Sequence, residues 1–223
     1  MLASAPAFAA GLDITVEGEA NGVIHIDLLE DLAPNHVAQI TQLASEGAYD
    51  NVVFHRVIDR FMAQTGDVQF GKTDAEAFDM SRAGIGGSEL PDLKAEFTGE
   101  SFETGVVGMA RSASPDSANS QFFIMFAPAP HLNGQYTVVG RVTEGMDVVN
   151  AIKKGLGGNG AVIGAPDKMA SVPVTASRIF KTLRDWPRGF AGPFSCRALI
   201  APDQTRVSRA MCNAISMQGS WPP

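Results

Sequence analysis

Residues 54–67, FHRVIDRFMAQTGD, decide both the fold of this chain and its chemistry. The first half mixes apolar with polar side chains in the way that is typical of a β-strand, and a charged Asp-Arg pair then interrupts it. Phe61 and Met62 follow the interruption and precede the amide side chain of Gln64. Because neighbouring side chains of a strand point to opposite faces, Arg56 and the Phe61–Met62 pair can line one shallow surface. Such a surface requires neither a metal nor a nucleophile.

The length and composition predict one globular domain with an appendage. The chain has 223 residues, of which 45% are hydrophobic and 18% charged, enough to bury a sizeable core. Thirteen Phe against two Trp and two Tyr indicate a core built on phenylalanine. The formal net charge of −7 argues against a nucleic-acid partner, which usually requires a basic surface. No run approaches the ~18 apolar residues that span a membrane, so we expect no membrane span.

Residues 1–10, MLASAPAFAA, resemble the end of an export signal. Ala-Phe-Ala has the small-x-small form of a signal-peptidase site, although the basic start and the full apolar stretch of a signal are missing. We therefore expect an exported, periplasmic protein. The alternative is an Ala-rich disordered terminus on a cytoplasmic protein.

The composition changes after Phe180. Residues 181–223 contain six Lys or Arg against two Asp, a net charge of +4, together with both Trp, both Cys and five Pro. Neither a strand nor a helix pattern is sustained there, so we expect a mobile basic extension, with a docked peripheral segment or a tether to an anionic surface as alternatives. A disulfide between Cys196 and Cys212 is compatible with an oxidising compartment, but two cysteines alone predict it weakly.

The body of the chain has the pattern of a β-barrel. Alternating or apolar runs predict seven or eight short strands, and helical spacing of apolar residues predicts two helices. The predicted strands are 12–16, 22–28, 52–57, 61–64, 105–110, 121–126, 136–142 and 172–179, and the helices run from Pro34 to Gly47 and around Met146–Ile152. This mostly-β pattern favours a closed antiparallel barrel with the helices outside it. Within the strand 121–126, Phe122 and Ile124 are expected in the core, opposite Phe123.

Three other kinds of site are not supported by the sequence. The glycines of residues 84–87 lack the Gly-Lys-Ser/Thr ending and the strand–helix frame of a phosphate-binding loop. The four histidines have no metal-ligand spacing. Asp67 and His55 could form part of a hydrolase triad, but no Gly-x-Ser-x-Gly elbow accompanies them.

The ordered set of motifs in residues 12–179 resembles the cyclophilin-type peptidyl-prolyl cis-trans isomerases. The motifs are FHRVI at 54–58, FMAQ at 61–64, GMA at 108–110, NSQFFI at 119–124 and LNGQYTVVGRV at 132–142. The resemblance implies an isomerase domain over residues 11–180, folded as an eight-stranded antiparallel barrel capped by two helices. It also implies a bacterial type of member that needs no cofactor and acts on proline-containing polypeptides. Separately, we expect a monomer without a metal site.

The implied reaction is rotation about an Xaa–Pro amide, whose barrier is about 18–20 kcal/mol. A twisted amide nitrogen loses its conjugation and becomes a hydrogen-bond acceptor, so a cationic donor aimed at it stabilises only the twisted state. Arg56 would be that donor, because a guanidinium is always charged and rigid. Gln64 would act beside it by hydrogen bonding the backbone of the substrate.

The remaining site residues also follow from the resemblance. Phe61, Met62, Phe123 and Leu132 would form an apolar socket for the proline ring, while Ala110 and Arg111 would pair with the polypeptide along the groove. His55 and Gln121 would border the site, and Tyr136 would pack on the proline or donate a hydrogen bond from its hydroxyl. His131 would stand at the position that contacts cyclosporin in the family.

Two positions depart from the family pattern. Thr65 replaces a usual glycine, and a β-branched residue would not easily adopt a positive φ there. His131 stands where eukaryotic members often have Trp, which predicts weak sensitivity to cyclosporin. Thr65 and the tail keep open an alternative of another class, a peptide-binding or chaperone-like module with little or no isomerase activity.

Overall fold

The computed structural model describes residues 10–176. The predicted export segment, except for Ala10, lies outside these residues. So do the end of the predicted strand 172–179, the basic extension 181–223 and the Cys196–Cys212 pair.

Short strands make up most of the regular structure, as the sequence predicted. The strands are β1 (Ala10–Glu17), β2 (Gly22–Leu28), β3 (Val52–Val53), β4 (Arg56–Ile58), β5 (Met62–Thr65), β6 (Val106–Met109), β7 (Phe122–Met125), β8 (Val138–Glu144), β9 (Lys168–Ser171) and β10 (Val174–Ala176). The helices are α1 (Pro34–Ser45) and α2 (Met146–Ala151), with the 3₁₀ turns η1 (Pro130–Leu132) and η2 (Gly158–Gly160).

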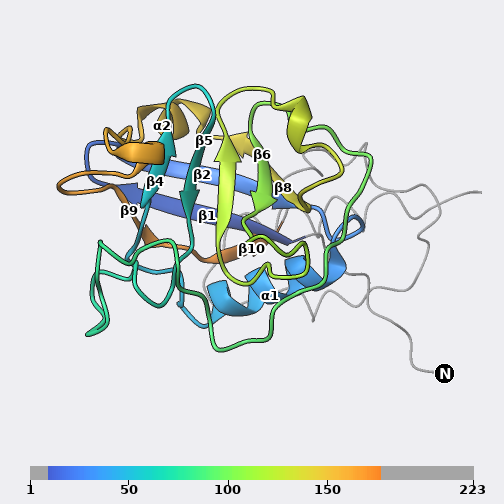
Figure 1. The fold of residues 1–223 in the computed structure, drawn as a ribbon, viewed down its shortest axis with the longest axis horizontal. Coiled ribbons are helices and arrows are strands. Elements are labelled where there is room, and N and C mark those ends of the chain that lie inside the picture. The colour runs from blue at the N-terminus through green and yellow to red at the C-terminus, as the bar shows by residue number, and fades with distance from the viewer. Residues whose placement is uncertain (1–9, 177–223) are drawn as a thin grey trace, which may run out of the picture. The chain divides into compact units, whose positions relative to one another are not determined.

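The strands form one curled antiparallel sheet. Their hydrogen-bonded order is β3-β9-β1-β2-β8-β6-β7-β5-β4, and β10 pairs with β1 beside this path. The two ends of the path, β3 and β4, are separated by only two residues of chain, so the sheet curls round until its ends come together. Figure 1 shows the strands between α1 at the bottom and α2 at the top. The mostly-β barrel-like fold with two helices is thereby confirmed.

The structure has more strands than the expected seven or eight. The segment 52–58 is divided into β3 and β4. Phe54 and His55, which lie between the two strands, do not take part in the strand pairing of the sheet. Strand β9 was not predicted, since Lys168–Ser171 contains no β-branched residue and only Met169 is buried. Val172 and Pro173 separate β9 from β10, because proline cannot donate to a ladder.

Alternation along the strands divides the buried side chains into two clusters. Phe122 and Ile124 of β7 point into the main core inside the sheet, as predicted. Phe123 and Met125 point the opposite way into a second cluster on the outer face, together with Met62 of β5. The second cluster matters for function, because it presents an apolar surface that the main core does not cover.

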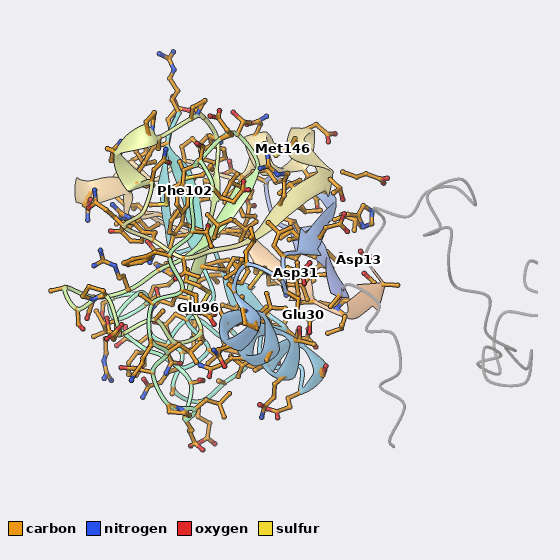
Figure 2. All side chains as sticks on the ribbon, turned by 90° about the vertical axis from the view of Figure 1, so that its right-hand side faces the viewer. Asp13, Glu30, Asp31, Glu96, Phe102 and Met146 are labelled. Atoms are coloured by element: carbon orange, nitrogen blue, oxygen red, sulfur yellow. The ribbon has the colours of Figure 1, made fainter. Side chains whose placement is uncertain are left out.

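Helix α1 covers one side of the sheet with the predicted stripe of apolar residues. Val37, Ile40 and Leu43 are buried, and Pro34 lies in the first turn, where its missing N–H costs nothing. Glu96 reaches this helix start, where its carboxylate accepts hydrogen bonds from Asn35 and His36 (Figure 2). In residues 10–176, no helix has the length and apolar character needed to cross a membrane.

Candidate active site

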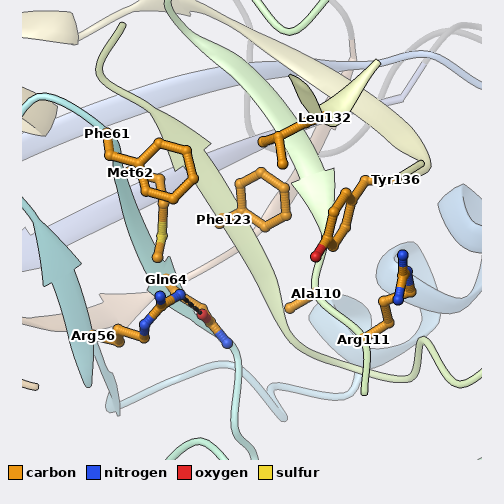
Figure 3. A pocket seen from close by; sticks show the side chains of 9 residues that line it. All are labelled: Arg56, Phe61, Met62, Gln64, Ala110, Arg111, Phe123, Leu132 and Tyr136. Carbon is orange, nitrogen blue, oxygen red and sulfur yellow. Dashed lines mark hydrogen bonds between the residues drawn. The ribbon is translucent and has the colours of Figure 1, made fainter. Parts of the chain in front are cut away.

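A shallow hollow on the outer face of the sheet brings together nine of the twelve residues predicted for the site (Figure 3). The hollow measures about 170 Å³. Its lining consists of Arg56, Phe61, Met62, Gln64, Ala110, Arg111, Phe123, Leu132 and Tyr136. The other three, His55, Gln121 and His131, lie next to this lining.

The pairing of four strands builds the centre of the hollow. Arg56 of β4 lies opposite Gln64 of β5, which lies opposite Phe123 of β7, which in turn lies opposite Gly108 of β6. Residues paired directly across a sheet project from the same face. The register therefore places a cation, an amide and an aromatic ring in one row on the outer face.

The guanidinium of Arg56 is held in position from two directions. Nη1 donates to Gln64 Oε1 at 3.1 Å, while Nε and Nη2 donate to the carbonyl oxygen and Oδ1 of Asn159, both at 2.9 Å. Partial burial lowers the pKa of Arg56, but a guanidinium stays protonated in proteins. Three of its five N–H groups are used in these bonds, which leaves donors for a substrate.

The amide of Gln64 connects Arg56 to the loop on the other side of the hollow. Its Nε2 donates to Gln121 Oε1 at 2.9 Å, and Gln121 Nε2 donates to the carbonyl of Gly86 at 2.7 Å. This series of hydrogen bonds gives Gln121 a role beside the pocket. Gln121 orients the amide of Gln64, and that amide in turn orients Arg56.

The glycine loop that contains Gly86 is anchored by the buried carboxylate of Asp67. Oδ2 accepts the N–H groups of Gly84 and Gly86 at 2.7 and 2.9 Å, and Oδ1 accepts those of Gln69 and Phe70. The glycine loop therefore binds an anionic group, but that group is a side chain of the protein itself. With both oxygens occupied, Asp67 is not available to a hydrolase triad.

Aromatic rings form the apolar part of the hollow. Phe123 stacks on Phe102 at 5.8 Å and meets Tyr136 edge-on at 5.7 Å. Gly108 leaves room for these rings, because a Cβ at this position would lie 2.6 Å from Phe102 Cε1 and 2.7 Å from Phe123 Cζ. Leu132, from η1, covers the end of this cluster. The result is a rigid apolar surface beside the Arg56 guanidinium.

The sequence matches the family "Cyclophilin type peptidyl-prolyl cis-trans isomerase/CLD" over residues 12–175. The chain belongs to this family. It is similar to a probable peptidyl-prolyl cis-trans isomerase of Brucella suis, with 57% identity over 156 residues that cover 70% of this chain and 79% of the relative. A Brucella abortus protein of the same description is 56% identical over the same coverage. The activity of the family, peptidyl-prolyl cis-trans isomerisation without a cofactor, is the activity of this chain.

Solved structures agree with the cyclophilin fold. A cyclophilin of Hirschia baltica has a TM-score of 0.58 at 25% identity, covering 73% of this chain and 72% of its own. A Cryptosporidium parvum cyclophilin-type isomerase has a TM-score of 0.62 at 21% identity, covering 76% and 99% respectively.

Thr65, which departs from the cyclophilin pattern, fits its position without strain. It lies in strand β5, its side chain is fully buried, and its hydroxyl donates to the carbonyl of Val53 at 2.9 Å. The positive φ of +88° belongs to the next residue, Gly66. The doubt raised by a β-branched residue at 65 therefore has no basis in the backbone.

His131 lies at the rim of the hollow. Its ring stacks on that of Phe61 with a centroid separation of 5.8 Å, and the side chain is exposed. The His131 ring therefore continues the surface formed by Phe61 beyond the hollow, but it does not line the hollow itself.

His55 lies behind the site of this cyclophilin and is almost fully buried. It contributes to a second hollow, of about 200 Å³, which Arg56 and Gln64 also line. Burial lowers the pKa of the His55 imidazole to about 4, against the opposing effect of the Asp67 carboxylate. The ring is therefore neutral at physiological pH, and its position suits packing behind Arg56 better than contact with a substrate.

The buried imidazole predicts a pH dependence of stability. An unfolded chain binds the proton near the ordinary pKa of about 6.5, whereas the folded chain binds it only near 4. Between these values the unfolded state holds more protons, so the free energy of unfolding falls as the pH falls from about 6.5 to 4, by on the order of 3 kcal/mol. We expect His55→Gln to reduce this fall in denaturant unfolding measured from pH 7 to 4.5. His131→Gln is the matched control and should follow the parent; equal pH slopes for parent and His55→Gln would contradict the assignment.

Asn159 is the site residue that the sequence analysis missed. It stands between Gly158 and Gly160 with a φ of +59°, a left-handed conformation that Asn adopts more readily than most residues. An Asn between two glycines indicates such a turn. Nothing in the sequence showed that the turn faces Arg56, which is 103 positions away.

Replacing Asn159 with glycine tests its role in holding Arg56. The variant keeps the left-handed backbone and its carbonyl but removes Oδ1, so we expect kcat/KM to fall about fivefold to tenfold, equivalent to about 1–1.4 kcal/mol. Asn51→Gly is the matched control, because Asn51 also has a positive φ, of +61°, and lies outside the site. Equal activity of both variants and the parent would show that Asn159 does not position the guanidinium.

Across residues 10–176, no group of three His, Cys, Asp or Glu side chains lies close enough together to hold a metal ion.

Proposed function

We propose that this chain rotates Xaa–Pro bonds by stabilising the twisted amide with Arg56 while the proline ring rests on Phe123, Met62 and Leu132. The observation that carries the proposal is the fixed guanidinium beside an apolar surface in one hollow. A planar amide nitrogen accepts hydrogen bonds poorly, whereas a twisted one accepts them well. The Arg56 donor therefore lowers the barrier without stabilising the ground state equally.

The rigidity of the site supports this mechanism. Asn159 and Gln64 hold the guanidinium before a substrate arrives, so little reorganisation is needed during the rotation. Ring contacts with Phe102 and Tyr136 likewise fix the orientation of Phe123 before a substrate binds. A fixed socket and a fixed cation together define where the amide nitrogen must lie.

Exchange NMR with a short Ala-Pro-containing peptide and the full chain tests the activity. We expect catalytic amounts of protein to accelerate cis–trans exchange, which otherwise takes tens to hundreds of seconds. Binding of the peptide without acceleration would favour the alternative, a cyclophilin-fold binding or chaperone-like module.

Three further properties belong to the proposal. We infer export to the periplasm from the Ala-Phe-Ala site in residues 1–10. The net charge of −7 supports the inference that the chain does not bind nucleic acid, and we expect a monomer. Fractionation of cells expressing the chain with and without residues 1–10 tests the export. If both forms stay in the cytoplasm, that part of the proposal fails and the isomerase assignment is unaffected.

A further inference from the structure

Two cations flank the hollow, and no acidic side chain belongs to its lining. Arg56 and Arg111 lie at opposite ends in Figure 3, with the aromatic cluster between them. The seven ion pairs of the described residues involve neither guanidinium. The site therefore has a concentrated positive charge, although the chain as a whole carries −7.

Arg111 is held in place by neutral groups. Nε and Nη2 donate to the carbonyl of Gln135 at 3.3 and 3.1 Å, and Nη1 donates to the carbonyl of Ser112 at 3.0 Å. Its guanidinium also stacks on Tyr136, with Cζ 4.5 Å from the ring centroid. Carbonyls and an aromatic face fix the orientation of the cation but leave its charge uncompensated.

A fixed, unpaired guanidinium is well suited to bind a carboxylate. Ordering a mobile arginine side chain on binding costs free energy and would weaken the affinity for a carboxylate. The Arg111 side chain is already ordered by its contacts within the protein, so this cost is smaller. Nη1 also donates to the carbonyl of Ala113 at 3.4 Å, so the bonds to the three carbonyls use at most four of the five N–H groups. A carboxylate arriving at the exposed edge would meet the positive charge without displacing an existing acidic partner.

We propose that Arg111 makes the site selective for polypeptides that carry an acidic side chain, Asp or Glu, within a few residues of the proline. Arg111 is then a specificity-determining residue rather than a catalytic one, since Arg56 is the cation beside the proline surface. This inference rests on the proposed function, because the position of the proline defines which flanking residue reaches Arg111.

The test uses the full chain and a set of peptides that differ at one position. Each peptide has one Ala-Pro bond, and Glu or Gln is placed at one of the three positions before or after it. We expect the Glu peptide to exceed its Gln counterpart about threefold to fivefold in kcat/KM and in affinity, at one or two of these positions and at low ionic strength. The ratio should fall toward one as salt is raised to about 0.5 M, because screening weakens an exposed ion pair.

Variants assign the preference to a residue. The Glu/Gln ratio should fall to about one in Arg111→Gln and persist in part in Arg111→Lys. Arg141→Gln removes the same charge outside the pocket lining and should keep the parental ratio. A ratio of one at every position in the parent, or a parental ratio in Arg111→Gln, would overturn the inference.

Measuring both affinity and exchange separates this inference from the proposed function. A chain that binds Glu peptides preferentially but never accelerates exchange would refute the isomerase mechanism and support the role of Arg111. A chain that isomerises all peptides equally would refute only the role of Arg111.

Discussion

Replacing Arg56 with alanine is expected to lower kcat/KM for a short Xaa–Pro peptide by about 100-fold or more, equivalent to about 2.7 kcal/mol of transition-state stabilisation. The guanidinium lies in the same cross-strand row as Gln64 and Phe123, whereas Arg111, the other guanidinium of the lining, donates to backbone carbonyls of Gln135 and Ser112. Exchange NMR at matched enzyme concentrations measures the loss.

Arg56→Lys separates charge from geometry. Lysine keeps the positive charge, but it cannot donate to Gln64 and to both oxygens of Asn159 through one planar group. We expect this variant to lie closer to Arg56→Ala than to the parent. Arg60→Ala is the control, because that exposed arginine belongs to the turn before Phe61 and does not line the pocket. Activity of Arg56→Lys close to the parent would mean that charge alone is sufficient.

Replacing Asp67 with asparagine is expected to cost the fold about 2–6 kcal/mol, about 1–3 kcal/mol for each of the two backbone N–H groups that lose their acceptor. The buried carboxylate accepts four backbone N–H groups, and an amide NH₂ would face two of these donors without accepting from them. Denaturant unfolding measures the loss. Because Gly86 also accepts from Gln121, we expect isomerase activity to fall even where the variant remains folded.

Asp116→Asn is the matched control for Asp67. Asp116 is exposed and its carboxylate accepts one backbone N–H, from Ala95 at 2.9 Å. We expect this change to cost no more than about 1 kcal/mol. Similar losses for the two variants would show that the four hydrogen bonds to Asp67 do not carry the stability of the glycine loop.

The local pattern of the sequence was sufficient for much of the fold. Strand alternation placed Phe122 and Ile124 in the main core and Phe123 outside it, and apolar spacing identified both helices. Residues 54–67 predicted a surface shared by Arg56, Phe61 and Met62, and the structure places all three in one hollow. These inferences succeeded because they depend on periodicity along a single strand or helix.

Features that depend on contacts between distant segments were not accessible. Strand β9 has little β propensity of its own and exists because it pairs with β1 and β3. Asn159 reaches Arg56 only through the folding of residues 155–162 against β4. The glycines at 84–87 gave no indication that their N–H groups surround Asp67.

The departure at Thr65 shows a limit of comparison with a family pattern. A glycine in relatives suggested a positive φ, but here the extended backbone of β5 continues through Thr65, and Gly66 makes the turn. The hydroxyl of Thr65 then gains a buried hydrogen bond to Val53. The substitution is compatible with an intact site.

Separate measurement of rotation and binding on the enzyme shows whether Arg56 acts on the twisted amide or on the bound ground state of the substrate. Exchange and line-shape NMR of a saturating Xaa–Pro peptide give the on-enzyme cis–trans rate and Kd separately, for the full chain and for Arg56→Ala. We expect the on-enzyme rate of Arg56→Ala to fall about 100-fold while Kd changes by less than about threefold. An unchanged on-enzyme rate with a Kd weakened by the same factor would make Arg56 a binding residue and contradict the mechanism.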